Sequence, residues 1–114
     1  MGGVKQVGGF LTVALFASVI GAQAQNLEKG AAVFAAQKCS LCHALDGKGN
    51  AKGALDGIGS KLKADEIRQW ILTPVDMAAK AQAQAARKPA MKAFATLPKE
   101  DLDALVAFLA SKKK

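Results

Sequence analysis

The chain has 114 residues and a formal net charge of +7, from 16 basic and 9 acidic side chains. This length allows one small domain, and the positive charge favours acidic protein partners or anionic surfaces. Nucleic-acid binding is excluded as a leading function, because the lysines are scattered singly, without a basic helix or an aromatic stacking platform. β-Branched residues are scarce, tyrosine is absent and several stretches have helical spacing, which indicates an all-α fold.

Residues 1–24 have the pattern of an export signal. Lys5 is the lone charge, residues 7–20 are mostly apolar, and Ala22-Gln23-Ala24 supplies the small residues of a cleavage site. An apolar run of about 14 residues is short for a bilayer span, which needs about 20, so a retained anchor is only the alternative. We expect cleavage after Ala24, a periplasmic location and a mature domain of residues 25–114 without stable membrane insertion.

The mature part has a thin core. It would contain 114 − 24 = 90 residues, with 22 large apolar side chains against 20 alanines. Domains of this size are marginally stable unless a disulfide, a metal or a buried cofactor adds stability. A disulfide between Cys39 and Cys42 would close a very small loop and stabilise little. The composition therefore favours a bound apolar group.

The first helix of this domain is expected over residues 27–36. Asn26 can cap it, and Leu27, Ala31 and Phe34 share one face. Gly30 costs about 1 kcal/mol in a helix interior. Its presence therefore indicates the close approach of another backbone.

Both cysteines and the only histidine of the chain lie in one pentad, Cys39-Ser40-Leu41-Cys42-His43. Two thiols three residues apart can each add to a vinyl group of haem, and the histidine behind them can ligate the iron. The spacing predicts one haem c, attached through Cys39 and Cys42, with His43 as an axial ligand.

The remaining elements alternate between loops and helices. Residues 46–59 are rich in turn formers and predict a loop. A helix is expected over residues 62–71, which include Trp70, and Thr73-Pro74 stops it. An exposed helix is expected over residues 76–88, ended by Pro89, and a second loop over residues 90–97.

The last helix is expected to begin at Pro98, with acidic residues in its first turn. Its apolar stripe has the spacing i, i+3, i+4, i+7, and Phe108 lies at the border of this stripe. The stripe consists of Leu102, Leu105, Val106 and Leu109. The three lysines that follow are expected to form a frayed, solvated tail.

The second axial ligand of the iron has to be a group other than histidine, because His43 is the only histidine. A methionine thioether is the usual alternative, and it raises the reduction potential. Met91 lies in a loop two residues after Pro89 and is the expected ligand. Met77 in the alanine-rich helix, where it could simply cover apolar surface, and an open sixth position are the alternatives.

With these motifs the chain resembles the class I c-type cytochromes, in particular small bacterial periplasmic monohaem ones. The resemblance covers residues 26–114, and its motifs occur in the family's order. They are the haem pentad, residues 55–62, residues 67–71, residues 88–91 and residues 102–109. The resemblance implies a cytochrome c fold of three to four helices around one covalent haem, ligated by His43 and Met91. It also implies that Gly30 and Phe34 face Phe108 where the first helix crosses the last.

Two further positions gain a role only from the resemblance. Trp70 is implied as a hydrogen-bond donor to a haem propionate, and simple packing on the ring is the alternative. The family usually has Gly-Pro after the haem-motif loop, and the carbonyl of that proline accepts a hydrogen bond from the proximal histidine. Here Gly53 is followed by Ala54, so the backbone group that orients His43 is left open.

The predicted function is that of a soluble one-electron carrier rather than an enzyme. An iron with the same two protein ligands in both oxidation states rearranges little and offers no open site. Four lysines, at positions 38, 52, 88 and 92, are expected to ring the haem edge of a monomer. They would dock on acidic faces of redox proteins such as a quinol-oxidising complex, a terminal oxidase or a dehydrogenase.

Two other classes of function stay open at this point. A weak sixth ligand would give a gas- or peroxide-reactive sensor or enzyme, which the alanine-rich segment before Met91 suggests. The non-haem alternatives are a copper site built from Cys39, Cys42, His43 and a methionine, and a thiol-redox pair. The predicted all-α context lacks the βαβ unit expected of a thioredoxin-like pair.

Overall fold

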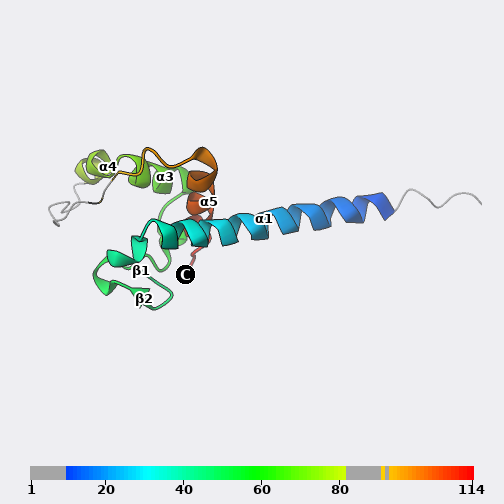
Figure 1. Cartoon of the computed structure of the whole chain (residues 1–114), viewed down its shortest axis with the longest axis horizontal. Helices are drawn as coiled ribbons and strands as arrows, with labels where there is room; N and C mark the ends of the chain where they lie inside the picture. The colour runs from blue at the N-terminus through cyan, green and yellow to red at the C-terminus, as the bar shows by residue number, and fades with distance from the viewer. Residues whose placement is uncertain (1–9, 82–90, 92) are drawn as a thin grey trace, which may run out of the picture.

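The computed structural model describes residues 10–81, 91 and 93–114, with only the backbone of residues 10–22 (Figure 1). The α-helices are α1 (Phe10–Ala36), α2 (Ile58–Lys61), α3 (Ala64–Leu72), α4 (Pro74–Lys80) and α5 (Lys99–Ala110). Two short 3-10 helices are η1 (Cys39–Leu41) and η2 (Ala51–Gly53), and strands β1 (Ala44–Leu45) and β2 (Lys48–Gly49) form an antiparallel hairpin. The all-α prediction is confirmed, since this hairpin is a local feature of the loop after the haem motif.

Helix α1 is longer than predicted. It begins at Phe10 and extends well beyond the other elements, so Asn26 lies in its interior and does not cap it (Figure 1). Residues 10–25 contain no proline, so no residue in this stretch forces the helix to end or to restart before Asn26. Cleavage after Ala24 stays a prediction. In the part of the chain that the structure describes, no helix has both the length and the apolar character needed to cross a membrane.

Gly30 lies where α1 crosses α5. A Cβ atom at this position would collide with the carbonyl oxygen of Ala104 and the Cβ atom of Phe108, so the two helices are closer than a side chain at position 30 allows. One turn further along α1, the rings of Phe34 and Phe108 have centroids 6.0 Å apart and planes tilted by 59°. This separation is favourable for an aromatic pair. The predicted crossing at Gly30, Phe34 and Phe108 is confirmed.

The apolar stripe of α5 forms the centre of the core. Its residues Leu102, Leu105, Val106 and Leu109 are buried, as the helical spacing predicts. The stripe packs against Val33 of α1 and against Ile67 and Ile71 of α3. Pro98 is the N-cap of α5 rather than its first residue, so the predicted start is one residue early.

Several boundaries in the middle of the chain differ from the predicted ones. Helix α2 begins in the stretch predicted as a loop and includes Gly59, and Leu62 is the C-cap of α2 rather than a residue of α3. Helix α3 ends at Leu72 as expected, but Pro74 also begins α4, because the first helical position does not need its missing N–H. The helix predicted over residues 76–88 thus starts earlier and also ends earlier, at Lys80 with Ala81 as its C-cap, rather than at Pro89. Residues 82–90 lie outside the described residues.

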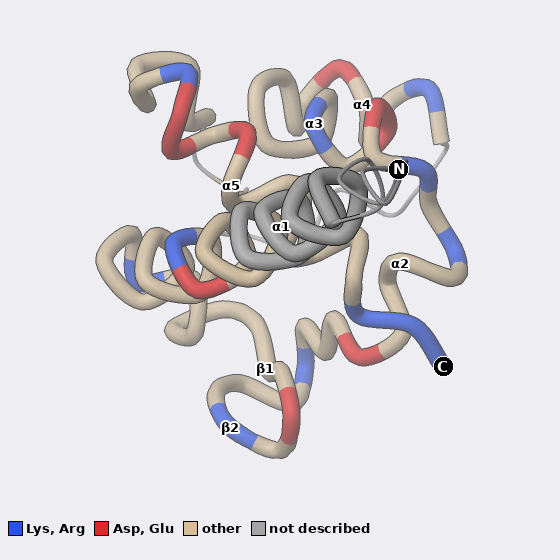
Figure 2. The backbone as a smooth tube through the Cα atoms, turned by 90° about the vertical axis from the view of Figure 1, so that its right-hand side faces the viewer, with Lys and Arg blue, Asp and Glu red and all other residues tan. Residues whose placement is uncertain are grey.

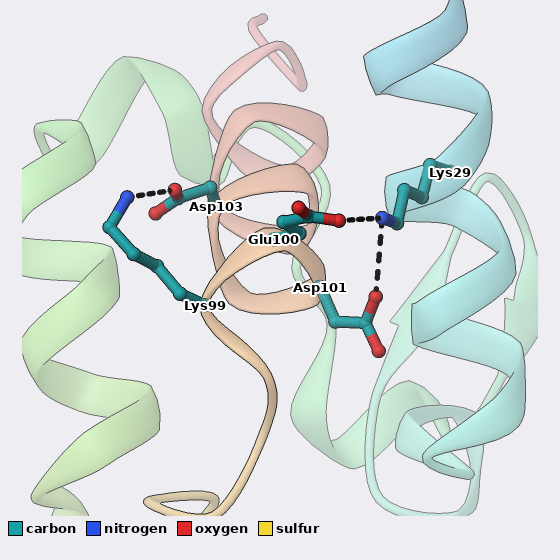
Figure 3. A network of polar contacts seen from close by, with 5 residues as sticks. All are labelled: Lys29, Lys99, Glu100, Asp101 and Asp103. Atoms are coloured by element: carbon teal, nitrogen blue, oxygen red, sulfur yellow. Dashed lines mark hydrogen bonds and ion pairs between the residues drawn. The ribbon is translucent and has the colours of Figure 1, made fainter.

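Charged side chains connect the start of α5 to α1 (Figure 3). The amino group of Lys29 on α1 lies 3.5 Å from a carboxylate oxygen of Glu100 and 3.4 Å from one of Asp101. Within α5, Lys99 lies 2.8 Å from Asp103, one turn away. Most of these side chains are exposed, so each pair adds little stability by itself. Together they help to fix the register of the helix crossing.

Replacing Asp103 with asparagine is expected to make folding stability less sensitive to acid. Hydrogen bonds from Lys99 and Arg68, each with an N–O distance of 2.8 Å, lower the pKa of Asp103. A carboxyl group with a lower pKa in the folded state adds stability above its unfolded pKa and loses it as the pH falls through the folded pKa. The difference in unfolding free energy between wild type and D103N should therefore shrink below about pH 4. Urea denaturation at several pH values measures this difference, and a difference that does not vary with pH would contradict the prediction.

Candidate cofactor site

An apolar cavity of about 360 Å³ lies between α1, α2, α3 and α5. Four buried residues from α3 and α5 line it, and partly buried or exposed side chains from the helices and the loops complete its walls. The four buried residues are Ile67, Ile71, Leu105 and Leu109. Such walls match the apolar faces of a haem macrocycle, whose burial would add the core that the composition lacks.

The Cys-x-x-Cys-His motif lies in and directly after η1, at the edge of this cavity. The backbone N–H groups of Cys42 and His43 both donate to the carbonyl oxygen of Cys39, at 3.2 and 2.9 Å, which folds the pentad into one tight turn. Cys39 lines the cavity, and burial raises the pKa of its thiol. Cys42 is exposed, and neither cysteine forms a disulfide. Both thiols are therefore available for thioether bonds.

The ring of His43 is oriented by the backbone. Its Nδ1 atom lies 2.8 Å from the carbonyl oxygen of Gly53. A neutral imidazole that donates from Nδ1 keeps the lone pair on Nε2 for a metal, and such a partner raises the basicity of the ligand. The accepting carbonyl belongs to Gly53 and not to Ala54, so the absence of a proline does not remove the bond.

Position 53 is also too crowded for a side chain. A Cβ atom there would collide with the carbonyl oxygen of Cys42 and lie 3.0 Å from Nδ1 of His43. We expect Gly53→Ala to displace this backbone, weaken the hydrogen bond and raise the reduction potential by tens of millivolts, because a less basic imidazole stabilises ferric iron less. A redox titration of the haem-loaded protein measures the change. Ala54→Gly is the matched control with an unchanged potential, and equal potentials in all three proteins would contradict the prediction.

Asn50 stabilises the backbone of the haem motif by hydrogen bonds, a role that sequence analysis missed. Its backbone N–H donates to the carbonyl oxygen of His43 and its side-chain amide to that of Leu41, both at 3.3 Å. Its side-chain oxygen accepts the backbone N–H of Lys52 at 3.0 Å. In the sequence Asn50 was indistinguishable from an ordinary turn former, because its partners depend on how the loop folds back.

Met91 lines the same cavity as His43 and is 36% exposed. Met77 lies on α4, is partly buried and does not line the cavity. The structure thus brings together the two side chains expected to ligate the iron, and it places the alternative methionine elsewhere. Ligation by Met91 stays a prediction, and Pro89, which was expected to position it, lies outside the described residues.

Trp70 lines the cavity from α3, and its indole N–H has no hydrogen-bond acceptor among the described residues. Its two predicted roles, propionate donor and packing surface, are therefore both compatible with its position. Gln37, Lys61 and Phe94 also line the cavity, although sequence analysis gave them no role. The backbone N–H of Phe94 donates to the carbonyl oxygen of Ile71 at 3.1 Å, which fixes the end of the Met91 loop against α3. The one available signal was that Phe94 is the only aromatic residue of that loop.

The non-haem alternatives fit this geometry less well. Among the described residues no three His, Cys, Asp or Glu side chains lie together as a metal-binding group, so Cys39, Cys42 and His43 do not converge on a copper site. The sheet found in this part of the chain is a two-residue hairpin, not a βαβ unit. A haem fits better, because it needs only one protein ligand on each side of its iron and two separate thiols.

Comparison with known proteins agrees with the site. A family model described as Cytochrome c matches residues 27–113, a range that contains the pentad, the helix crossing and every residue of the cavity. No curated protein and no solved structure gives a significant match. Because the family model covers most of the chain, this protein belongs to the cytochrome c family, whose members bind haem c covalently and use it for electron transfer.

Proposed function

We propose that this protein is an exported, periplasmic one-electron carrier whose low-spin haem is ligated by His43 and Met91. One observation carries the proposal: both side chains line a single apolar cavity, and the bond from His43 to Gly53 leaves Nε2 free for the iron. Bound haem c supplies the one-electron chemistry between ferrous and ferric iron. The soft thioether of Met91 favours the ferrous state and raises the potential.

The chain's own residues suit an electron carrier, called the relay below, rather than an enzyme. A protein ligand on each side leaves no coordination position for substrate, and the cavity lining is almost entirely apolar, with few groups that could bind or activate a substrate. Carbon monoxide tests this function, because it competes with a sixth ligand on ferrous iron. We expect slow and incomplete binding to the reduced protein at low carbon monoxide concentrations. Rapid, complete binding would overturn the relay.

The alanine-rich sequence before Met91 favours one second candidate function. A labile Met91 would open the iron to a gas or a peroxide, and the protein would then act as a sensor or an enzyme. The carbon monoxide experiment separates the two functions, since only the second predicts fast saturation.

Trp70 and Lys61 are the proposed partners of the haem propionates. They add an N–H donor and a cation to a lining that is otherwise almost entirely apolar. Trp70→Phe keeps an aromatic ring for packing and removes the donor. A changed potential in this variant supports the propionate role, and an unchanged potential leaves Trp70 with the packing role alone.

We assign the electron donors and acceptors to proteins with acidic docking faces, such as a quinol-oxidising complex, a terminal oxidase or a dehydrogenase. Lys38 and Lys52 are exposed and flank the haem motif on both sides, whereas Lys88 and Lys92 lie outside the described residues. Steering by lysines predicts that the electron-transfer rate of the monomer falls steeply as ionic strength rises. A rate that does not depend on salt would argue against such partners.

Export belongs to the same proposal, and the mass of the mature protein tests it. Cleavage after Ala24 leaves Gln25 as the first residue of the haem-loaded protein. Intact-mass analysis of protein isolated from the periplasm measures this directly. A mass that includes residues 1–24 would establish the retained anchor instead.

A further inference from the structure

The last three residues are held against α2, so the predicted frayed tail is wrong. The backbone N–H of Gly59 donates to the carbonyl oxygen of Lys112 at 2.8 Å, and that of Lys114 donates to Oγ of Ser60 at 2.9 Å. The hydroxyl group of Ser60 donates in turn to the carbonyl oxygen of Lys114 at 3.3 Å. The basic C-terminal end lies beside α2 in Figure 2. The first N–H groups of any helix lack partners within it, and here the tail supplies one.

The side chain of Lys112 makes a second connection, to the hairpin that follows the haem motif. Its amino group lies 2.9 Å from a carboxylate oxygen of Asp46 and 4.9 Å from the ring centroid of Phe108. The Lys112 side chain is only 25% exposed, less than that of any other cation in an ion pair of the described residues. Asp46 also donates its backbone N–H to the Asp56 carboxylate at 2.9 Å. One lysine thus joins α5 to the hairpin.

Both segments held by the tail border the haem cavity. Helix α2 places Ile58 and Lys61 in the cavity lining. The hairpin begins directly after His43, and its far end returns to the carbonyl oxygen of His43 through Asn50. A displacement of the tail would therefore make two segments less firmly held: α2, which lines the cavity, and the hairpin that follows His43.

We propose that Lys112–Lys114 form a C-terminal clamp that positions α2 and the His43 hairpin and keeps the sixth coordination position of the iron closed to external ligands. The inference rests on the proposed function, because it assumes that Met91 holds that position. The clamp residues are positioning residues, since their contacts reach the cavity only through other segments. Removing them raises the population of locally open states in which an external ligand replaces Met91.

Imidazole binding to the ferric, haem-loaded protein tests the clamp. Deleting Lys112–Lys114 removes all contacts of the clamp, while Lys112→Gln removes the ion pair with Asp46 and the contact of the cation with the Phe108 ring, and leaves the backbone hydrogen bonds. We expect the apparent affinity for imidazole to rise about tenfold in the deletion and about threefold in K112Q, since a net hydrogen bond or ion pair is worth that order of change. Lys113→Gln is the matched control: it makes the same change of charge, and its exposed side chain forms no ion pair in the described part of the chain.

Three further variants separate the clamp from a general loss of stability. Lys112→Arg keeps the cation and should restore the wild-type affinity. Asp46→Asn should raise the affinity no more than K112Q does, because it removes the ion pair and leaves the contact of Lys112 with Phe108. The double variant should show no further increase over K112Q, because the ion pair is already lost in each single variant. If the deletion prevents haem attachment, the comparison of K112Q with K113Q still tests whether the clamp controls imidazole binding.

The outcomes for the clamp and for the proposed function are distinct. Equal imidazole affinities in wild type, K112Q and the deletion would overturn the clamp while leaving the relay intact. Equal increases in K112Q and K113Q would also overturn it, because they would show an effect of net charge. Rapid carbon monoxide binding by the wild type would instead overturn the proposed function on which the clamp rests.

Discussion

Replacing Met91 with alanine is expected to lower the reduction potential of the haem-loaded protein by more than about 100 mV, because axial ligands move haem potentials over hundreds of millivolts. The thioether favours ferrous iron, and the water or hydroxide that replaces it favours ferric iron. The absorption band that arises from charge transfer between methionine and ferric iron should disappear in the same variant. An optical redox titration records both changes in one experiment.

Met77→Ala is the natural control for this prediction. Met77 is a partly buried residue of α4 that does not line the cavity, so its removal should leave the spectrum and the potential close to those of the wild type. If the band survives in M91A and is lost in M77A, then Met77 is the ligand. If the wild type has no such band, then the sixth position is open, and the sensor or enzyme becomes the better function.

The sequence predicts best those features that local chemistry encodes. The pentad predicts haem attachment because only its spacing places two thiols and an imidazole on one turn. Gly30, a glycine in a helix interior, indicates the close approach of another backbone before any partner is known. The partner, the last helix at Phe108, was implied only by the resemblance to the class I c-type cytochromes. The stripe of α5 follows from its period alone.

Features that depend on backbone groups meeting across the fold could not be predicted. The acceptor for His43 is a carbonyl oxygen, which every residue has, so no residue type points to Gly53. The clamp pairs backbone groups of Gly59 and Lys112, and the sequence shows only a glycine-rich loop and a lysine tail. The start of α1 was missed for another reason: the capping preference of Asn26 is weak and local, and without a proline in residues 10–25 the helix continues through that position.

Valine at position 30 is expected to have the largest effect on folding stability. Helix propensity alone predicts a gain in stability, since valine is more favourable than glycine in a helix interior by about 0.4 kcal/mol. The side chain would, however, collide with the backbone of Ala104 and with Cβ of Phe108, and neither is the flexible end of a side chain. The helices have to separate, which also loosens the contact between Phe34 and Phe108. We expect a loss of about 3 kcal/mol or more in unfolding free energy, typical of severe overpacking in a core.

Urea denaturation of the haem-loaded variants, followed by circular dichroism, measures this loss. Ala35→Val is the matched control, because it adds the same β-branched side chain at an exposed position of α1 and should cost less than about 1 kcal/mol. Gly30→Ala should fall between the two, since even a single methyl group meets Ala104. If G30V is as stable as A35V, the two helices separate at little cost, and the role of Gly30 is one of local backbone preference. Helix propensity favours Gly30→Val and disfavours Ala35→Val, by about 1 kcal/mol in total, so a larger loss in G30V than in A35V can only come from the close approach of the two helices.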